Sequence, residues 1–86
     1  MAQNSEIAVR PLSEIAREIK SDWQNWSNSY AADYLRAMSE LNSIDDDYFA
    51  DSGKSVVLYF LANAQSWRGE TARRIKAELK KMAGIK

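Results

Sequence analysis

The chain has no cysteine and no histidine, and these two absences exclude much of the chemistry that small proteins use. Without cysteine the fold cannot be stabilised by disulfide bonds. Without histidine the usual zinc sites and the Ser-His and Cys-His nucleophile pairs are excluded. An enzyme built from this sequence would have to work with carboxylates, Lys, Tyr or backbone amides. We therefore predict a protein that is not an enzyme, with no catalytic residues, no metal and no cofactor.

Long hydrophobic runs are lacking as well. No apolar stretch approaches the roughly 18 residues that a membrane span needs, and the first residues do not contain the apolar core of a signal peptide. The sequence therefore predicts a soluble, cytoplasmic protein that does not associate with membranes. What the chain does contain is apolar material for a core, since 45% of its 86 residues are hydrophobic and these include three Trp, four Tyr and two Phe.

Apolar residues recur at helical spacing in four segments of the chain. Residues 1–10 have no such period and are predicted to be a flexible arm. Residues 11–86 are predicted to form a single all-α domain, a compact bundle of four helices. The first helix is expected to begin at about residue 12 and to end within residues 24–29. The other three are expected over about residues 30–42, 54–67 and, after Gly69, to about residue 82.

The third predicted helix is apolar on nearly its whole circumference. Val56, Val57, Phe60, Leu61 and Ala64 fill one side of it. A helix of this kind is typically the central one, covered by its neighbours. Gly69 is expected to end it in a left-handed conformation.

The tripeptide Gly53-Lys54-Ser55 resembles the end of a phosphate-binding loop. That loop needs another glycine five positions before Gly53, where this chain has Tyr48. The segment before it is rich in aspartate, which would repel phosphate. We therefore interpret Asp51 or Ser52 as the N-cap of the third helix.

Residues 43–52 carry four aspartates and are expected to be a loop or a single turn. Ser43 is predicted to cap this turn, with Asp46 reaching back to it. An EF-hand calcium loop starting at Asp45 fails at its sixth position, which is Ala50, and at its twelfth, which is Val56. We expect an acidic surface that binds a positively charged partner, formed by Asp45, Asp46, Asp47 and Asp51.

Charge is distributed unevenly along the chain although the net charge is zero. Residues 1–55 contain ten acidic and five basic residues, whereas residues 56–86 contain two and seven. The last helix and the segment before it form a basic surface, which is predicted to bind a partner or nucleic acid through phosphate contacts. Its members are Arg68, Arg73, Arg74, Lys76, Lys80 and Lys81.

A helix-turn-helix around Gly69 is a related possibility, but the glycine is flanked by Arg68 and Glu70 where apolar residues are usual. The tryptophans are interpreted as core rather than as a base-stacking platform. Trp23 and Trp26 extend the apolar stripe of the first helix, and Trp67 extends that of the third.

Three segments, "PLSEIAREI", "SIDDDY" and "DSGKSVVLYFLANAQSWRGETARRIKAELK", give the chain a resemblance to small uncharacterised proteins of bacterial phages and mobile elements. The resemblance covers most of residues 11–82. It implies a bacterial setting and favours an interaction role, but it assigns no activity and no functional residue. From the charge pattern we predict a non-enzymatic interaction or regulatory module that binds a host or phage protein. The alternative is a nucleic-acid-binding module that uses the basic last helix.

Overall fold

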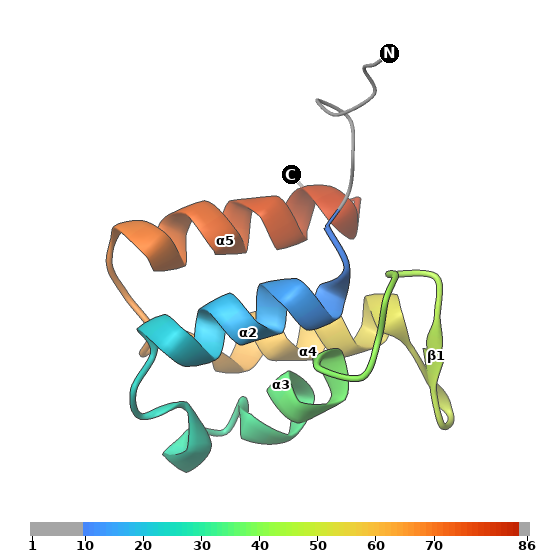
Figure 1. The fold of residues 1–86 in the computed structure, drawn as a ribbon, viewed down its shortest axis with the longest axis horizontal. Helices are drawn as coiled ribbons and strands as arrows, with labels where there is room; N and C mark the ends of the chain where they lie inside the picture. Colours follow the sequence, from blue (N-terminus) through green and yellow to red (C-terminus); the bar gives the residue numbers. More distant parts are fainter. Residues whose placement is uncertain (1–9, 85–86) are drawn as a thin grey trace.

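The computed structural model of the protein describes residues 10–84, which form four α-helices, one 3₁₀ turn and a two-stranded antiparallel sheet (Figure 1). The predicted helical bundle is confirmed in its main features. The sheet shows that the fold is not strictly all-α as predicted. In chain order the elements are α2 (Leu12–Asp22), η1 (Trp26–Asn28), α3 (Ala32–Met38), β1 (Asp47–Tyr48), β2 (Asp51–Ser52), α4 (Gly53–Asn63) and α5 (Glu70–Met82).

Helix α2 begins without a side-chain cap. Pro11 is its N-cap residue, and the backbone amides of Leu12 and Ser13 donate to the carbonyls of Asn42 and Leu41. The helix ends at Asp22, because Trp23 turns to an extended conformation and is buried in the core. The helix therefore ends just before the predicted stretch 24–29, and Trp26, which was predicted to extend its apolar stripe, lies outside it in η1.

The third helix of the bundle, α4, is also shorter than predicted. It begins with the predicted Ser52 cap, whose Oγ accepts the amide of Ser55 at 3.1 Å. It ends at Asn63, whose side-chain amide donates to the carbonyl of Tyr59. The chain then turns so that Trp67 enters the core.

Gly69 has a different role from the predicted one. It is the N-cap residue of α5, with a φ of 115°, and it does not end α4. This left-handed value suits glycine, because a Cβ would strain the backbone there.

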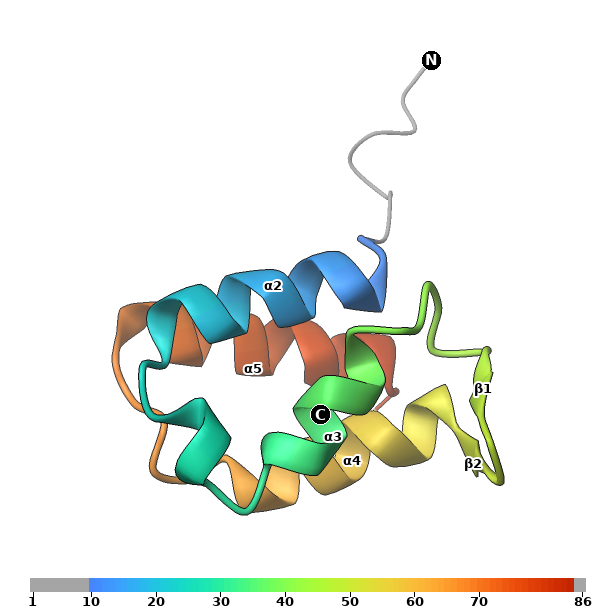
Figure 2. The same cartoon turned by 60° about the horizontal axis from the view of Figure 1, so that its bottom comes forward.

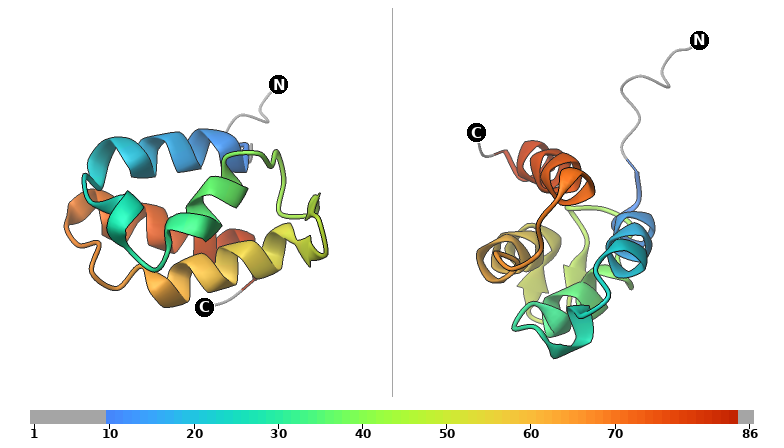
Figure 3. Two further views of the ribbon diagram at one scale, coloured as in Figure 1. Left: turned by 90° about the horizontal axis from the view of Figure 1, so that it is seen from below. Right: turned by 90° about the vertical axis from the view of Figure 1, so that its left-hand side faces the viewer.

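The core lies between α2, α3, α4 and α5, as the end-on view in Figure 3 shows. Trp23 and Trp67 stack with their ring centroids 5.8 Å apart, and both meet Phe60 edge-on. The indole N–H of Trp67 donates to the Asp22 carboxylate at 2.9 Å, so this buried ring keeps a hydrogen bond. The prediction that Trp23 and Trp67 are core residues is confirmed.

Trp26 lies in η1 and is only partly buried. The ammonium of Lys20 lies 4.9 Å from the centroid of its ring, and the guanidinium of Arg36 lies 5.3 Å from it. Both contacts are within cation–π range. The exposed part of this tryptophan is therefore already in contact with two cations of the same chain.

An ion-pair network joins α2 to α5. Arg10 donates to both carboxylate oxygens of Glu78, at 2.8 and 3.0 Å, and to Glu18 at 2.9 Å. Glu18 also accepts from Arg74. The bond to Glu78 raises the pKa of Arg10, and the bonds from Arg74 and then Arg10 lower the pKa of Glu18. These charge-assisted bonds set the packing of the two helices.

None of the helices within residues 10–84 is long and apolar enough to cross a membrane. The predicted arm falls on residues 1–9, outside the described residues, and on Arg10.

Candidate protein-interaction surface: the acidic hairpin

The acidic segment forms a tight turn followed by a β-hairpin. The carboxylate of Asp46 accepts the amides of Asn42 and Ser43 at 3.0 and 3.1 Å. The hydroxyl of Ser43 accepts the amide of Asp45 at 3.0 Å. The predicted cap at Ser43, with Asp46 reaching back to it, is therefore confirmed, and the Ser43 hydroxyl accepts from Asp45 rather than from Asp46. Asp46 thus has a structural role.

The hairpin follows this turn and was not predicted from the sequence. Asp47 pairs with Ser52 and Tyr48 with Asp51, which leaves Phe49 and Ala50 at the tip (Figure 2). A two-residue hairpin loop needs a residue with positive φ, and that position usually holds glycine or asparagine. Here Phe49 has a φ of 57°. The side chain at the tip is therefore an aromatic ring in a conformation that costs about 1–2 kcal/mol.

Phe49 is 88% exposed, and within residues 10–84 its only aromatic contact is an edge-on one with Tyr48, with the ring centroids 4.7 Å apart. Asp45, Asp47 and Asp51 are exposed on the same turn and hairpin. We call these four residues the acidic hairpin surface. It combines an unburied aromatic side chain with three carboxylates, whereas the fourth predicted member, Asp46, is used inside the turn.

Gly53 joins the hairpin to α4, and its role is steric. A Cβ at this position would lie 2.7 Å from the carbonyl oxygen of Ile44 and 2.8 Å from that of Ser43. The Gly53 amide donates to the carbonyl of Asp46 at 2.6 Å. Because that amide and the Ser55 amide already have partners, the Gly-Lys-Ser segment forms a capped helix start with the acidic turn packed against it.

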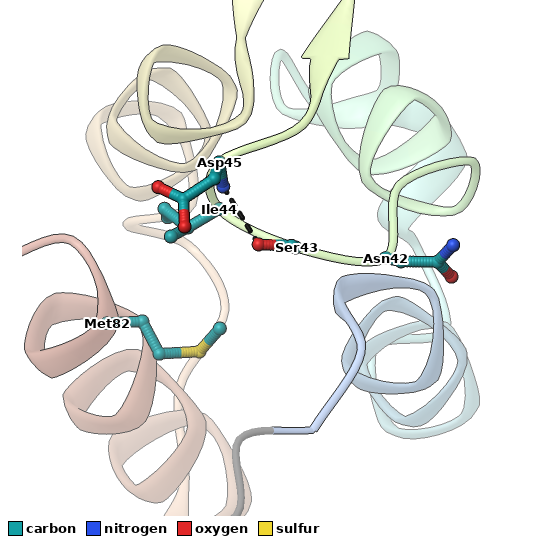
Figure 4. Close-up of a pocket in the computed structure, with 5 residues that line it drawn as sticks. All are labelled: Asn42, Ser43, Ile44, Asp45 and Met82. Carbon is teal, nitrogen blue, oxygen red and sulfur yellow. Dashed lines mark hydrogen bonds between the residues drawn. The ribbon is translucent and has the colours of Figure 1, made fainter.

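A small pocket lies between the acidic turn and the end of α5. Its volume is about 300 Å³ and its lining residues are Asn42, Ser43, Ile44, Asp45 and Met82. Figure 4 shows the Met82 side chain reaching from α5 toward the turn that carries Ile44 and Asp45. An enzyme built from this sequence would have to use carboxylates, Lys, Tyr or backbone amides. The lining of this pocket contains Asp45 but no lysine and no tyrosine. Within residues 10–84, no three acidic side chains are arranged to hold a metal ion.

The predicted basic surface is divided by the fold. Arg74 pairs with Glu18, and the ammonium of Lys76 donates to the carbonyl of Trp67 at 2.6 Å. Burial, with Lys80 and Arg68 nearby, lowers the pKa of Lys76. The remaining four residues, Arg68, Arg73, Lys80 and Lys81, are exposed.

The acidic and basic surfaces are not paired with each other. Among the residues that the structure describes, no ion pair joins Asp45, Asp46, Asp47 or Asp51 to α5. The charges of α5 that pair within the molecule do so with Arg10 and with α2. Asp45, Asp47 and Asp51 therefore take part in none of the ion pairs formed within residues 10–84.

Phe49 is the residue that the sequence analysis missed. Its neighbours Tyr48 and Ala50 do not form any of the usual two-residue hairpin sequences, so turn chemistry gave no signal for it.

Comparison of the chain with family models, with curated proteins and with solved structures gives no match. The resemblance to small phage and mobile-element proteins therefore stays a prediction.

Proposed function

We propose that this protein is a small, non-enzymatic interaction module that binds a protein partner through the acidic hairpin surface. The observation that carries the proposal is Phe49. An aromatic ring that is almost fully exposed, held in a strained conformation at the tip of a hairpin, has no packing role that would offset its cost. Aromatic side chains, Phe included, are enriched at protein interfaces relative to the rest of the surface.

The carboxylates around Phe49 define the partner's chemistry. Asp45, Asp47 and Asp51 are exposed, so they attract a positively charged surface and repel an acidic one. The partner is therefore a protein with basic residues near a recess that accepts the ring of Phe49. Salt screens the charges that attract the partner, so the association rate is expected to fall as the salt concentration rises.

Affinity capture from the cells that produce the protein tests this proposal. One variant carries Asp47→Lys, Asp51→Lys and Phe49→Asn, and a control variant carries Arg73→Glu and Lys80→Glu. We expect a protein that the wild type and the control both recover and that the hairpin variant loses. If every recovered protein persists with the hairpin variant, the hairpin is not the interface.

A nucleic-acid interface along α5 is the second candidate. It is favoured by Arg73, Lys80 and Lys81, which are exposed and take part in none of the ion pairs formed within residues 10–84. It is weakened because Arg74 and Lys76 already have partners in this chain.

Titration of labelled duplex and single-stranded DNA at two salt concentrations tests this alternative. Counterion release makes phosphate binding strongest at low salt, so absence of binding there would reject it. Binding that falls steeply with salt and is lost in the Arg73→Glu, Lys80→Glu variant would support it.

A further inference from the structure

The outward side of α4 is apolar and uncovered within the described part of the chain. Leu58 is 36% and Tyr59 50% exposed, and Ala62 is exposed one turn after Leu58. Tyr59 contacts the half-buried Tyr34 of α3. The prediction that the third helix is covered by neighbours on all sides is therefore wrong for this side. The only charged residue of α4 is Lys54, in its first turn.

The acidic hairpin surface and a cleft lie at opposite ends of α4. The acidic hairpin surface lies at its N-terminal end, and the connection to α5 lies at its C-terminal end, on the opposite side of the molecule (Figures 1 and 2). At the C-terminal end is a cleft of about 510 Å³. Its lining includes Tyr30, which is 90% exposed, and the exposed Arg68, and the rest of it apart from Ala62 is polar: Asn28, Ser29, Asn63, Gln65 and Ser66. Ala62 belongs both to this lining and to the apolar side of α4, so the two are continuous.

We infer that the partner of the acidic hairpin surface is a second copy of this chain. This inference rests on the proposed function and names its partner. Two copies related by a two-fold axis across α4 would place the helices antiparallel. The Phe49 tip of each copy then enters the cleft of the other, where Tyr30 offers an aromatic face and Arg68 an opposite charge to Asp51.

A two-fold interface must be complementary to itself, and this surface meets that condition. Antiparallel α4 helices align their dipoles favourably and bring each Lys54 near the carbonyl end of the opposite helix. Leu58 and Tyr59 pack against the same two residues of the second copy, and no like charges face each other there. The net charge of zero means that no overall repulsion opposes association.

The expected contact between the two copies is small. Helix α4 has 11 residues and is therefore about 16 Å long, with one hairpin and one loop at its ends. Such a contact belongs to the small interfaces of weak complexes. Self-association is therefore expected in the micromolar range and has to be measured up to about 1 mM protein.

Analytical ultracentrifugation over a concentration series tests the inference. We expect a monomer–dimer equilibrium for the wild type, and about tenfold weaker association for both Asp51→Lys and Arg68→Glu. The double variant restores opposite charges across the interface, so its association returns to within about threefold of the wild type. Arg73→Glu changes the net charge as Arg68→Glu does and is expected to leave association unchanged.

Two results would overturn the inference. One is a wild type that stays monomeric at every concentration. The other is a dimer whose stability is the same in both single variants and in the double variant. In either case, a different protein captured through Phe49, as tested above, would leave the proposed function standing. If neither self-association nor hairpin-dependent capture is observed, both the inferred dimer and the proposed function are rejected.

Discussion

Replacing Gly53 by alanine places a methyl group against two backbone carbonyls. The new Cβ would lie 2.7 Å from the oxygen of Ile44 and 2.8 Å from that of Ser43. Both distances are shorter than real Cβ contacts, and backbone atoms have no flexible end that can move aside. The acidic turn therefore has to shift away from the start of α4.

The cost of this shift follows from the hydrogen bonds that hold the turn. The Gly53 amide donates to the carbonyl of Asp46, and the Asp46 carboxylate accepts two further amides. Losing two or three such bonds costs about 2–3 kcal/mol, at roughly 1 kcal/mol each. The higher helix propensity of alanine returns less than about 1 kcal/mol. We expect Gly53→Ala to lower the free energy of unfolding by about 2 kcal/mol, which lowers the Tm by about 8–16 °C.

Thermal unfolding followed by far-ultraviolet circular dichroism, together with urea titration, measures this effect. The matched control is Lys54→Ala, because Lys54 is the exposed next residue of the same helix and takes no part in the hydrogen bonds that Asp46 and Gly53 make in the turn. It should change the free energy of unfolding by less than about 0.5 kcal/mol. If Gly53→Ala has no larger effect than this control, the steric explanation of Gly53 is wrong.

Three further variants test other parts of the structure. Ser52→Ala removes the cap of the Ser55 amide and should lower the free energy of unfolding by about 1 kcal/mol in urea titration; no change would mean the cap is not formed. Because Arg74 lowers the pKa of Glu18, the stabilisation from Glu18 is present above the unfolded-state pKa near 4.5 and is lost as the pH falls through the lower folded-state value. The free energy of unfolding of Glu18→Gln should therefore fall less than that of the wild type between about pH 5 and pH 3, and equal slopes would contradict the pairing. Phe49→Asn, which suits a positive φ, should leave the free energy of unfolding unchanged or raise it by up to about 1 kcal/mol while it abolishes hairpin-dependent capture; marked destabilisation would show that the ring serves the fold.

Periodicity predicted the helices well where one side is apolar and the other is polar. Both α2 and α5 have such a pattern, and the buried residues of α5, Ala72, Ile75 and Leu79, recur at the helical spacing of three and four residues. The cap at Ser52 could be predicted because a serine before an apolar run is a local signal. Trp23 and Trp67 were placed in the core correctly although the helices expected to carry them end earlier.

Helix ends and the hairpin depend on contacts between distant segments, which periodicity does not report. The end of α2 lies where Trp23 leaves the helix to stack on Trp67, 44 positions later in the sequence. The hairpin has a phenylalanine where turn chemistry favours glycine or asparagine, so no local rule predicted it. Of the candidate site, the sequence indicated the carboxylates and not the ring between them.

Photo-crosslinking at position 49 tests the role of the acidic hairpin surface most directly. A photoreactive phenylalanine analogue replaces Phe49 in one protein and Gln24, an exposed residue outside the hairpin, in a control. On irradiation in the producing cells, we expect a protein adduct from position 49 that is absent from position 24, and an adduct of twice the 9.8 kDa monomer mass if the partner is a second copy. No adduct from position 49, or the same adducts from both positions, would contradict the account.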